Sequence, residues 1–218
     1  MHFHVITLFP KAFDSYINTS IIGRAIKDKK IAVSFYNPRD FTKDTWRRVD
    51  QKPYGGGPGM VLEAKSVLRA AEKAIGKKNR KNVEVIFFDT SGKEFSNVYA
   101  RHVARVKKHA VLICGRYEGV DARVQKILKA KKVSIGNYTL TGGELPALVV
   151  LDAVSRQIPG VLGKLESVEE ERTASPEVYT RPEVLIWKGK KHRVPRVLLS
   201  GHHAEIEKWK LKQRKQRE

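Results

Sequence analysis

The chain has 218 residues, with 43 Lys and Arg against 23 Asp and Glu, and therefore a formal net charge of +20. Its length suits one ordinary domain or one domain with a small appendage, and 41% hydrophobic residues can form a core. No apolar run reaches the roughly 18 residues that a spanning helix needs, and a single cysteine, Cys114, argues against a disulfide scaffold.

The cationic excess favours a polyanionic partner, because Lys and Arg attract phosphate backbones and release their counterions. The alternative is a lysine-rich surface that only keeps the protein in solution. A membrane partner is not expected, since no basic amphipathic segment with bulky apolar residues stands out. With one cysteine and no visible secretory signal, we expect a cytoplasmic protein.

Taken in chain order, the apolar runs predict strands and helices that alternate. Strands are expected at residues 2–9, 31–36, 83–88, 110–114 and 132–136. Helices are expected at residues 13–30, 63–75, 96–106, 121–130 and 144–155. This alternation predicts an α/β domain with a largely parallel sheet and helices on both faces.

Composition changes after residue 163, and we expect a domain boundary there. Residues 164–176 are polar and acidic, which is typical of a flexible interdomain linker. Residues 177–218 form a small basic segment that closes with a helix at 203–216. The net charge is 29 − 14 = +15 for residues 1–163 and 14 − 9 = +5 for residues 164–218, so both parts carry basic surface.

Glycine-bearing loops follow three of the predicted strands, at residues 90–92, 115–119 and 136–143. Ligands of open α/β sheets bind at the carboxyl ends of the strands, and glycines there let the backbone approach a ligand closely. Each glycine could instead only terminate its strand. The glycine run 55–59 lacks the ending of a phosphate-binding P-loop, and no G-x-G-x-x-G follows the first strand.

Cysteine and histidine residues give no strong signal of a metal or nucleophile site. Cys114 ends an apolar run, so we expect a small buried hydrophobic residue rather than a nucleophile. His102 and His109 lie among basic residues and are expected at the surface. We expect no metal-ligand cluster.

Six blocks of sequence resemble the bacterial tRNA (guanine-N1)-methyltransferase family, a branch of the SPOUT methyltransferases. They are residues 53–60, 114–121, 134–147, 154–163, 179–182 and 198–206. The blocks occur in order along essentially the whole chain, and they are long and specific.

The resemblance implies a SPOUT-type α/β domain with a deep trefoil knot at its C-terminal side, over residues 1–163. It implies S-adenosylmethionine as methyl donor and a homodimer with the active site at the subunit interface. The implied substrate is tRNA, bound through its anticodon arm and methylated at N1 of guanosine 37. Family members commonly continue beyond the last block, so we expect residues 177–218 to be a shortened, mostly helical tRNA-binding domain.

Cofactor contacts can be transferred onto the three strand-end loops by this resemblance. The expected residues are Thr90, Gly115, Tyr117, Glu118, Ile135, Gly136, Asn137, Tyr138, Thr139, Leu140, Gly142 and Gly143. Thr90 stands where family members commonly have Pro, and Asn137 stands where they commonly have Asp. Backbone amides and carbonyls with an apolar slot suit an adenine and a sulfonium group.

Methylation of guanine N1 needs a base for the N1 proton and a cation for the charge that develops on O6. Arg156 matches the family arginine that supports this charge. The family's base is a linker aspartate, and Glu171 takes its place here, with Glu170 as the alternative. A glutamate retains the carboxylate but adds a methylene, which can move the base by about 1 Å.

Two other functions remain as alternatives at this point. One is a different SPOUT activity, ribose 2′-O-methylation; the other is a non-catalytic RNA-binding relic. The family is also associated with Mg²⁺, although no residue cluster in the sequence indicates a site for it.

Overall fold

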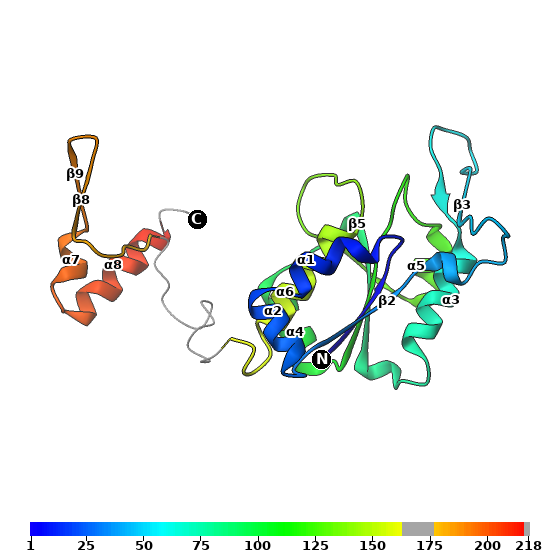
Figure 1. The fold of residues 1–218 in the computed structure, drawn as a ribbon, viewed down its shortest axis with the longest axis horizontal. Helices are drawn as coiled ribbons and strands as arrows, with labels where there is room; N and C mark the ends of the chain where they lie inside the picture. Colours follow the sequence, from blue (N-terminus) through cyan, green and yellow to red (C-terminus); the bar gives the residue numbers. More distant parts are fainter. Residues whose placement is uncertain (163–176, 216–218) are drawn as a thin grey trace. The chain divides into compact units, whose positions relative to one another are not determined.

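A computed structural model describes residues 1–162 and 177–215 (Figure 1). The chain divides into two compact units, Met1–Gly163 and Lys164–Glu218, and each is described by itself. Within the described residues, no helix combines the length and the apolar character that crossing a bilayer requires.

A five-stranded sheet forms the centre of the first unit. Its strands are β1 (His2–Ile6), β2 (Ala32–Tyr36), β5 (Val83–Glu94), β6 (His109–Ile113) and β7 (Lys131–Ser134). They lie in the order β2-β1-β6-β5-β7, and every neighbouring pair is parallel. The predicted parallel α/β architecture is therefore confirmed.

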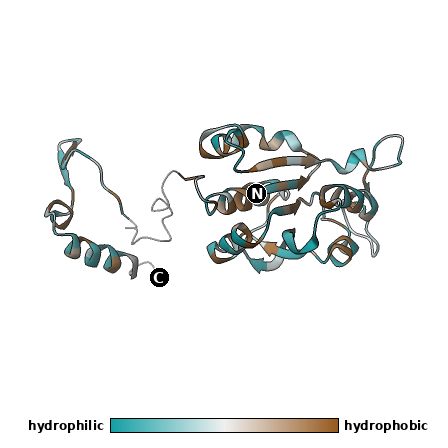
Figure 2. Cartoon of the chain, turned by 90° about the horizontal axis from the view of Figure 1, so that it is seen from below, coloured by the Kyte–Doolittle hydropathy of each residue, from teal (hydrophilic) through white to brown (hydrophobic). Residues whose placement is uncertain are grey.

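Helices cover both faces of this sheet, as the strand alternation requires (Figure 1). One face carries α1 (Asp14–Ile17), α2 (Ser20–Lys27), α4 (Asn97–Val106) and α6 (Glu144–Ser155). The other carries α3 (Ala64–Ile75) and α5 (Ala122–Leu128). Figure 2 shows apolar residues along the strands, whereas most helices have hydrophilic and hydrophobic sides.

A hydrophobic core lies on each face of the sheet, and alternate residues of the strands contribute to one core or the other. Phe3, Val5 and Leu112 are buried on the α6 face, while Ile6 and Ile113 are buried on the α3 face. Single-residue alternation therefore determines which helices each strand contacts.

The expected continuous helix at 13–30 is wrong. The segment contains a short 3₁₀ turn, η1 (Pro10–Phe13), followed by α1 and α2, with an interruption at Asn18 and Thr19. Asn18 donates from its side chain to the carbonyl of Asp14, and Thr19 donates to that of Ser15. Such side-chain bonds compete with helical hydrogen bonds and end the first helix.

Sequence periodicity also missed a small hairpin around the glycine run. It consists of β3 (Asp50–Gln51) and β4 (Val61–Leu62), which pair antiparallel. Gly55, Gly56, Gly57 and Gly59 between them all have positive φ, a conformation that side chains other than glycine rarely adopt. Two further 3₁₀ turns are η2 (Pro38–Asp40) and η3 (Arg80–Asn82).

The second unit contains a hairpin and two helices. The hairpin joins β8 (Val184–Trp187) to β9 (Lys190–Arg193) through Lys188 and Gly189, both at positive φ. Positive φ at both central residues suits the twist of a two-residue hairpin turn. The helices α7 (Arg196–Leu199) and α8 (His203–Lys215) follow, so the expectation of a mostly helical segment missed the hairpin.

Candidate functional site

Three loops meet at the carboxyl ends of β5, β6 and β7, which lie at one edge of the sheet because these strands are parallel. They enclose a cavity of about 340 Å³. Its lining includes all of the predicted cofactor residues except Asn137, namely Thr90, Gly115, Tyr117, Glu118, Ile135, Gly136, Tyr138, Thr139, Leu140, Gly142 and Gly143. Tertiary structure thus brings together residues that span more than 50 positions of the chain.

Close backbone contacts between two of these loops shape the cavity. The N–H of Gly143 donates to the carbonyl of Gly115 at 2.9 Å, and Arg116 forms an antiparallel bridge with Gly142. A Cβ at Gly143 would lie 2.5 Å from the Cα of Cys114, so only glycine fits there. Cys114 itself is buried, as expected for a small hydrophobic residue, and burial raises the pKa of its thiol.

Thr90 lies in a different kind of element from the one expected. Residues 90–92 belong to β5, in an irregularity between Phe88 and Lys93, both of which pair with Val133. The extra residues leave the ladder and bring Asp89 and Thr90 to the cavity. Sequence reasoning treated this bulge as a loop because Ser91 and Gly92 are typical turn residues.

Asp89 is a cavity residue that the sequence analysis did not select. Its Oδ1 accepts from the backbone N–H and the hydroxyl of Ser91, at 2.8 and 2.6 Å, and its Oδ2 lies 2.9 Å from the Nζ of Lys132. Partial burial raises the pKa of this carboxyl, but the Ser91 and Lys132 contacts outweigh burial and hold it below its usual value. The cavity therefore has a fixed anionic group at one side.

An ion pair between Arg116, which lines the cavity, and buried Glu144 joins two of the loops around it. The Oε2 of Glu144 lies 2.9 Å from the Nε of Arg116, out of line for a hydrogen bond, and Oε1 accepts from the hydroxyl of Thr7 at 2.7 Å. The Arg116 guanidinium also lies 4.5 Å from the ring centre of Phe9. Both charged residues stand inside the quoted sequence blocks, but their pairing was not visible in the sequence.

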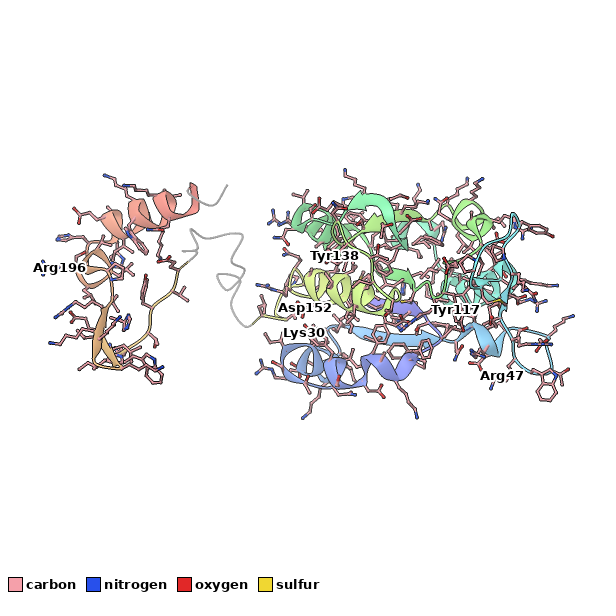
Figure 3. The ribbon with its side chains drawn as sticks, turned by 90° about the horizontal axis from the view of Figure 1, so that it is seen from above. Lys30, Arg47, Tyr117, Tyr138, Asp152 and Arg196 are labelled. Carbon is pink, nitrogen blue, oxygen red and sulfur yellow. The ribbon has the colours of Figure 1, made fainter. Side chains whose placement is uncertain are left out.

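Two tyrosines stand in the loops that line the cavity (Figure 3). Tyr117 has a positive φ of 60° and is half exposed, and Tyr138 donates its hydroxyl to the carbonyl of Ile135 at 3.2 Å. Glu118 donates its backbone N–H to the carbonyl of Met60, which ties the cavity loop to the glycine-rich hairpin. These loops are therefore positioned mainly through backbone hydrogen bonds.

Arg156, the predicted catalytic cation, does not line the cavity of its own chain. Arg156 follows the last residue of α6, whereas the cavity lies at the start of that 12-residue helix. At 1.5 Å per residue, the two ends are about 18 Å apart. Glu170 and Glu171 lie outside the residues that the structure describes.

Beside Arg156, the outer side of α6 presents an unusual stripe. Leu145 and Val149 are 60% and 44% exposed, and Asp152 and Arg156 continue the stripe at helical spacing. Asp152 accepts a 2.5 Å hydrogen bond from the hydroxyl of Tyr16, which raises the pKa of Tyr16 to about 12. Figure 3 labels Asp152 on this helix.

Comparison with known proteins gives consistent matches along the whole chain. The family model described as "tRNA (Guanine-1)-methyltransferase TrmD" matches residues 1–218. A tRNA (guanine-N(1)-)-methyltransferase of Buchnera aphidicola is 45% identical over 97% of this chain and 88% of its own length. Proteins with the same name from Ruminiclostridium cellulolyticum and Clostridioides difficile are 44% and 42% identical, over 98% and 96% of this chain and 91% and 90% of their own lengths.

Proposed function

The chain belongs to the tRNA (guanine-1)-methyltransferase family, and from this premise we propose that it methylates N1 of guanosine 37 in tRNA with S-adenosylmethionine as donor. The observation that carries the proposal is the glycine-built cavity at the carboxyl ends of β5, β6 and β7. The tRNA substrate and the lone cysteine favour the cytoplasm as its compartment.

The residues of the cavity fit S-adenosylmethionine in size and chemistry. A volume of about 340 Å³ lies within the range of small-ligand sites. The apolar side chains of Ile135, Leu140 and Pro146 and many backbone polar groups line it, as an adenosine requires. The carboxylates of Asp89 and Glu118 offer negative charge to a cationic ligand. When bound, S-adenosylmethionine supplies an electrophilic methyl group.

Proton removal from guanine N1 falls to a carboxylate outside the cavity loops. We assign this role to Glu171, with Glu170 as the alternative, because Glu171 takes the position of the family's linker aspartate and an ionised carboxylate can accept that proton as the methyl arrives. Arg156 supplies the positive charge that stabilises the electron density moving to O6. Without that charge, deprotonation and methyl transfer both become slower.

A second copy of the chain completes the active site in this proposal. Arg156 lies about 18 Å along α6 from the cavity of its own chain, too far for a side chain to span. The exposed stripe of Leu145 and Val149 on α6 is apolar on the side that faces away from its own core. A helix that is apolar on nearly all sides is normally buried. A two-fold dimer would bury the exposed stripe of α6. The same dimer would bring Arg156 to the partner's cavity.

The knotted topology and the tRNA contacts also belong to this proposal. Support for a trefoil knot comes from the start of α6, which lies against the backbone of residues 114–116. Support for tRNA binding comes from the exposed strand β9, which carries Lys190, Lys191 and Arg193, and from the basic helix α8. A Mg²⁺ requirement rests on the family resemblance, and activity after chelation and Mg²⁺ re-addition tests it.

The decisive experiment is mass mapping of nucleosides after incubation with unmodified tRNA and S-adenosylmethionine. We expect 1-methylguanosine at position 37 and none in a tRNA with adenosine at that position. A 2′-O-methylated ribose would replace this proposal with the other SPOUT activity. Absence of methylation by protein that binds S-adenosylmethionine would refute it.

A further inference from the structure

Three histidines converge at the edge of the sheet opposite the cavity. His2 and His4 alternate along β1 and therefore share one face, and His109 begins β6 in parallel register with His2. His4 is fully buried, while His2 and His109 are partly buried. His109 is partly exposed, as expected of a residue near the surface, but its ring also contacts that of buried His4.

Their ring nitrogens lie close together, although more widely spaced than in an occupied zinc site. The Nε2 of His4 lies 3.3 Å from the Nδ1 of His109, and one ring nitrogen from each of the three residues lies within 4.8 Å of the others. Two imidazoles bound to one tetrahedral Zn²⁺ at about 2.0–2.1 Å have nitrogens about 3.4 Å apart. Closing the wider spacing needs a side-chain movement on the order of 1 Å.

Neighbouring hydroxyl groups orient two of the rings. The Nδ1 of His4 lies 3.1 Å from the hydroxyl of Tyr36, and the Nε2 of His2 lies 2.8 Å from the hydroxyl of Ser34. These contacts occupy one nitrogen of each ring. The Nε2 of His4 is hydrogen-bonded to the Nδ1 of His109, and the His2 and His4 rings are stacked with their centroids 4.0 Å apart. A bound ion would therefore replace the His4–His109 hydrogen bond and turn the stacked rings so that their nitrogens converge. Hydrogen bonds of this kind are what hold metal-binding histidines in a productive orientation.

The three histidines offer neutral nitrogen donors, which favour Zn²⁺ over ions that prefer oxygen. Burial lowers the pKa of all three imidazoles, that of His4 to about 3, and neighbouring His and Lys78 charges add to the effect. Neutral imidazoles are the form that binds metal. Three imidazole nitrogens suit Zn²⁺, whereas Mg²⁺ and Ca²⁺ prefer oxygen ligands.

The site is also reachable from solvent. A separate cavity of about 460 Å³ is lined by His2 and His109 together with Met1, Lys108 and Ile158. It provides an entry path and room for water as a fourth ligand. Lys78 and Lys108 add positive charge nearby, but Lys78 is held by the carbonyls of Ala74 and Ile75 at 2.8 and 3.2 Å.

We propose that His2, His4 and His109 bind one Zn²⁺ ion that links β1 to β6 at the amino edge of the sheet. The site is separate from the cofactor cavity, which lies at the carboxyl edge. Because the ligands come from two strands far apart in the sequence, bound Zn²⁺ stabilises the folded chain against unfolding.

The test is a calorimetric titration of the full chain with ZnCl₂, using protein prepared without a polyhistidine tag and stripped with chelator. The variants are His109→Gln, His2→Gln and Tyr36→Phe, with His102→Gln on the exposed side of α4 as matched control. We expect one equivalent of Zn²⁺ for wild type and control, and affinity lower by about 100-fold or more for the ligand variants. Tyr36→Phe should lower it by about tenfold.

Three further measurements make the outcome independent of any one variant. Circular dichroism without Zn²⁺ verifies that each variant is folded, and Co²⁺ added to wild type should give the visible absorption of a four-coordinate nitrogen site. Zn²⁺ should also raise the unfolding temperature of wild type but not of His109→Gln. The proposal is overturned if wild type binds no Zn²⁺, if folded His109→Gln and His2→Gln bind it as wild type does, or if Mg²⁺ displaces it.

Discussion

Gly143 packs directly against the backbone of Cys114: a Cβ on Gly143 would lie 2.5 Å from the Cα of Cys114. The contact joins the residue before α6 to the end of β6. It is continued by the hydrogen bond from the Gly143 N–H to the Gly115 carbonyl. The cavity therefore depends on two glycine loops that touch through their backbones.

Gly143→Ala should weaken S-adenosylmethionine binding by about tenfold or more, which corresponds to 1.4 kcal/mol. The added methyl group has to move backbone, which cannot yield as a side chain can. Gly115→Ala is the matched control, because its Cβ would meet only the Cγ2 of Val120, at 3.4 Å. Calorimetric titration with S-adenosylmethionine should give a smaller loss for the control, and equal losses would contradict the packing argument.

Arg156→Ala should lower the methyl-transfer rate by about 10²–10³-fold, the usual effect of removing one group that stabilises developing charge. Affinity for S-adenosylmethionine should be retained, because the proposed role of Arg156 is to stabilise charge on guanine O6 and not to bind the cofactor. Single-turnover kinetics and calorimetry separate the two effects. Loss of cofactor binding instead would assign Arg156 to the binding site.

Mixing Arg156→Ala with Gly143→Ala tests whether the active site is shared between chains. If Arg156 acts in the partner's cavity, random re-assortment should produce about one intact site in four. Val149→Glu, on the exposed stripe of α6, should dissociate the dimer in sedimentation experiments. At S-adenosylmethionine concentrations below the Kd of Gly143→Ala, a mixture no more active than the mean of its two components would show that each chain forms its own site.

Glu171→Gln and Glu170→Gln identify the base. The variant that removes it should lower the methyl-transfer rate by about 10²–10⁴-fold, because Gln cannot accept the N1 proton. The other variant should retain most of the activity, and both should bind S-adenosylmethionine as wild type does. Wild-type rates for both variants would remove the linker carboxylates from the mechanism.

Glu84 should make the stability of the first unit sensitive to acid. This buried carboxylate of β5 accepts a 2.7 Å hydrogen bond from Tyr99 and pairs with Lys131 and Lys107 at 2.5 and 3.4 Å. Burial raises the pKa of Glu84, but these contacts outweigh it and hold the pKa below its ordinary 4.5. The stabilisation is therefore present above about pH 4.5 and is lost as pH falls through the lowered value.

Urea unfolding at pH 7 and under acid conditions measures this contribution. At pH 7, Glu84→Gln should lower the free energy of unfolding by about 1.5–3 kcal/mol, the contribution of hydrogen bonds to a charged group. The variant should lose less stability than wild type on acidification. Glu72→Gln on the exposed side of α3 is the control, and an equal change in that variant would exclude a specific role of Glu84.

Much of the fold follows from local patterns. The apolar runs at 83–88 and 110–114 correspond to β5 and β6, and the helix at 144–155 has the predicted bounds. These elements could be predicted because the hydrophobic periodicity of a strand or helix is a property of a few neighbouring residues. The resemblance to the methyltransferase family likewise depended on contiguous blocks, and the comparisons confirm it.

What the sequence alone determined is thus the α/β class, the alternation of the five sheet strands with helices, and the family. Only the tertiary structure decided that the bulge of β5 carries Asp89 and Thr90 to the cavity, that Arg116 pairs with Glu144, and that His109 meets His2 and His4. These relationships join residues from different strands and helices, so they depend on strand order and register. Neither quantity is encoded in the periodicity of any single segment.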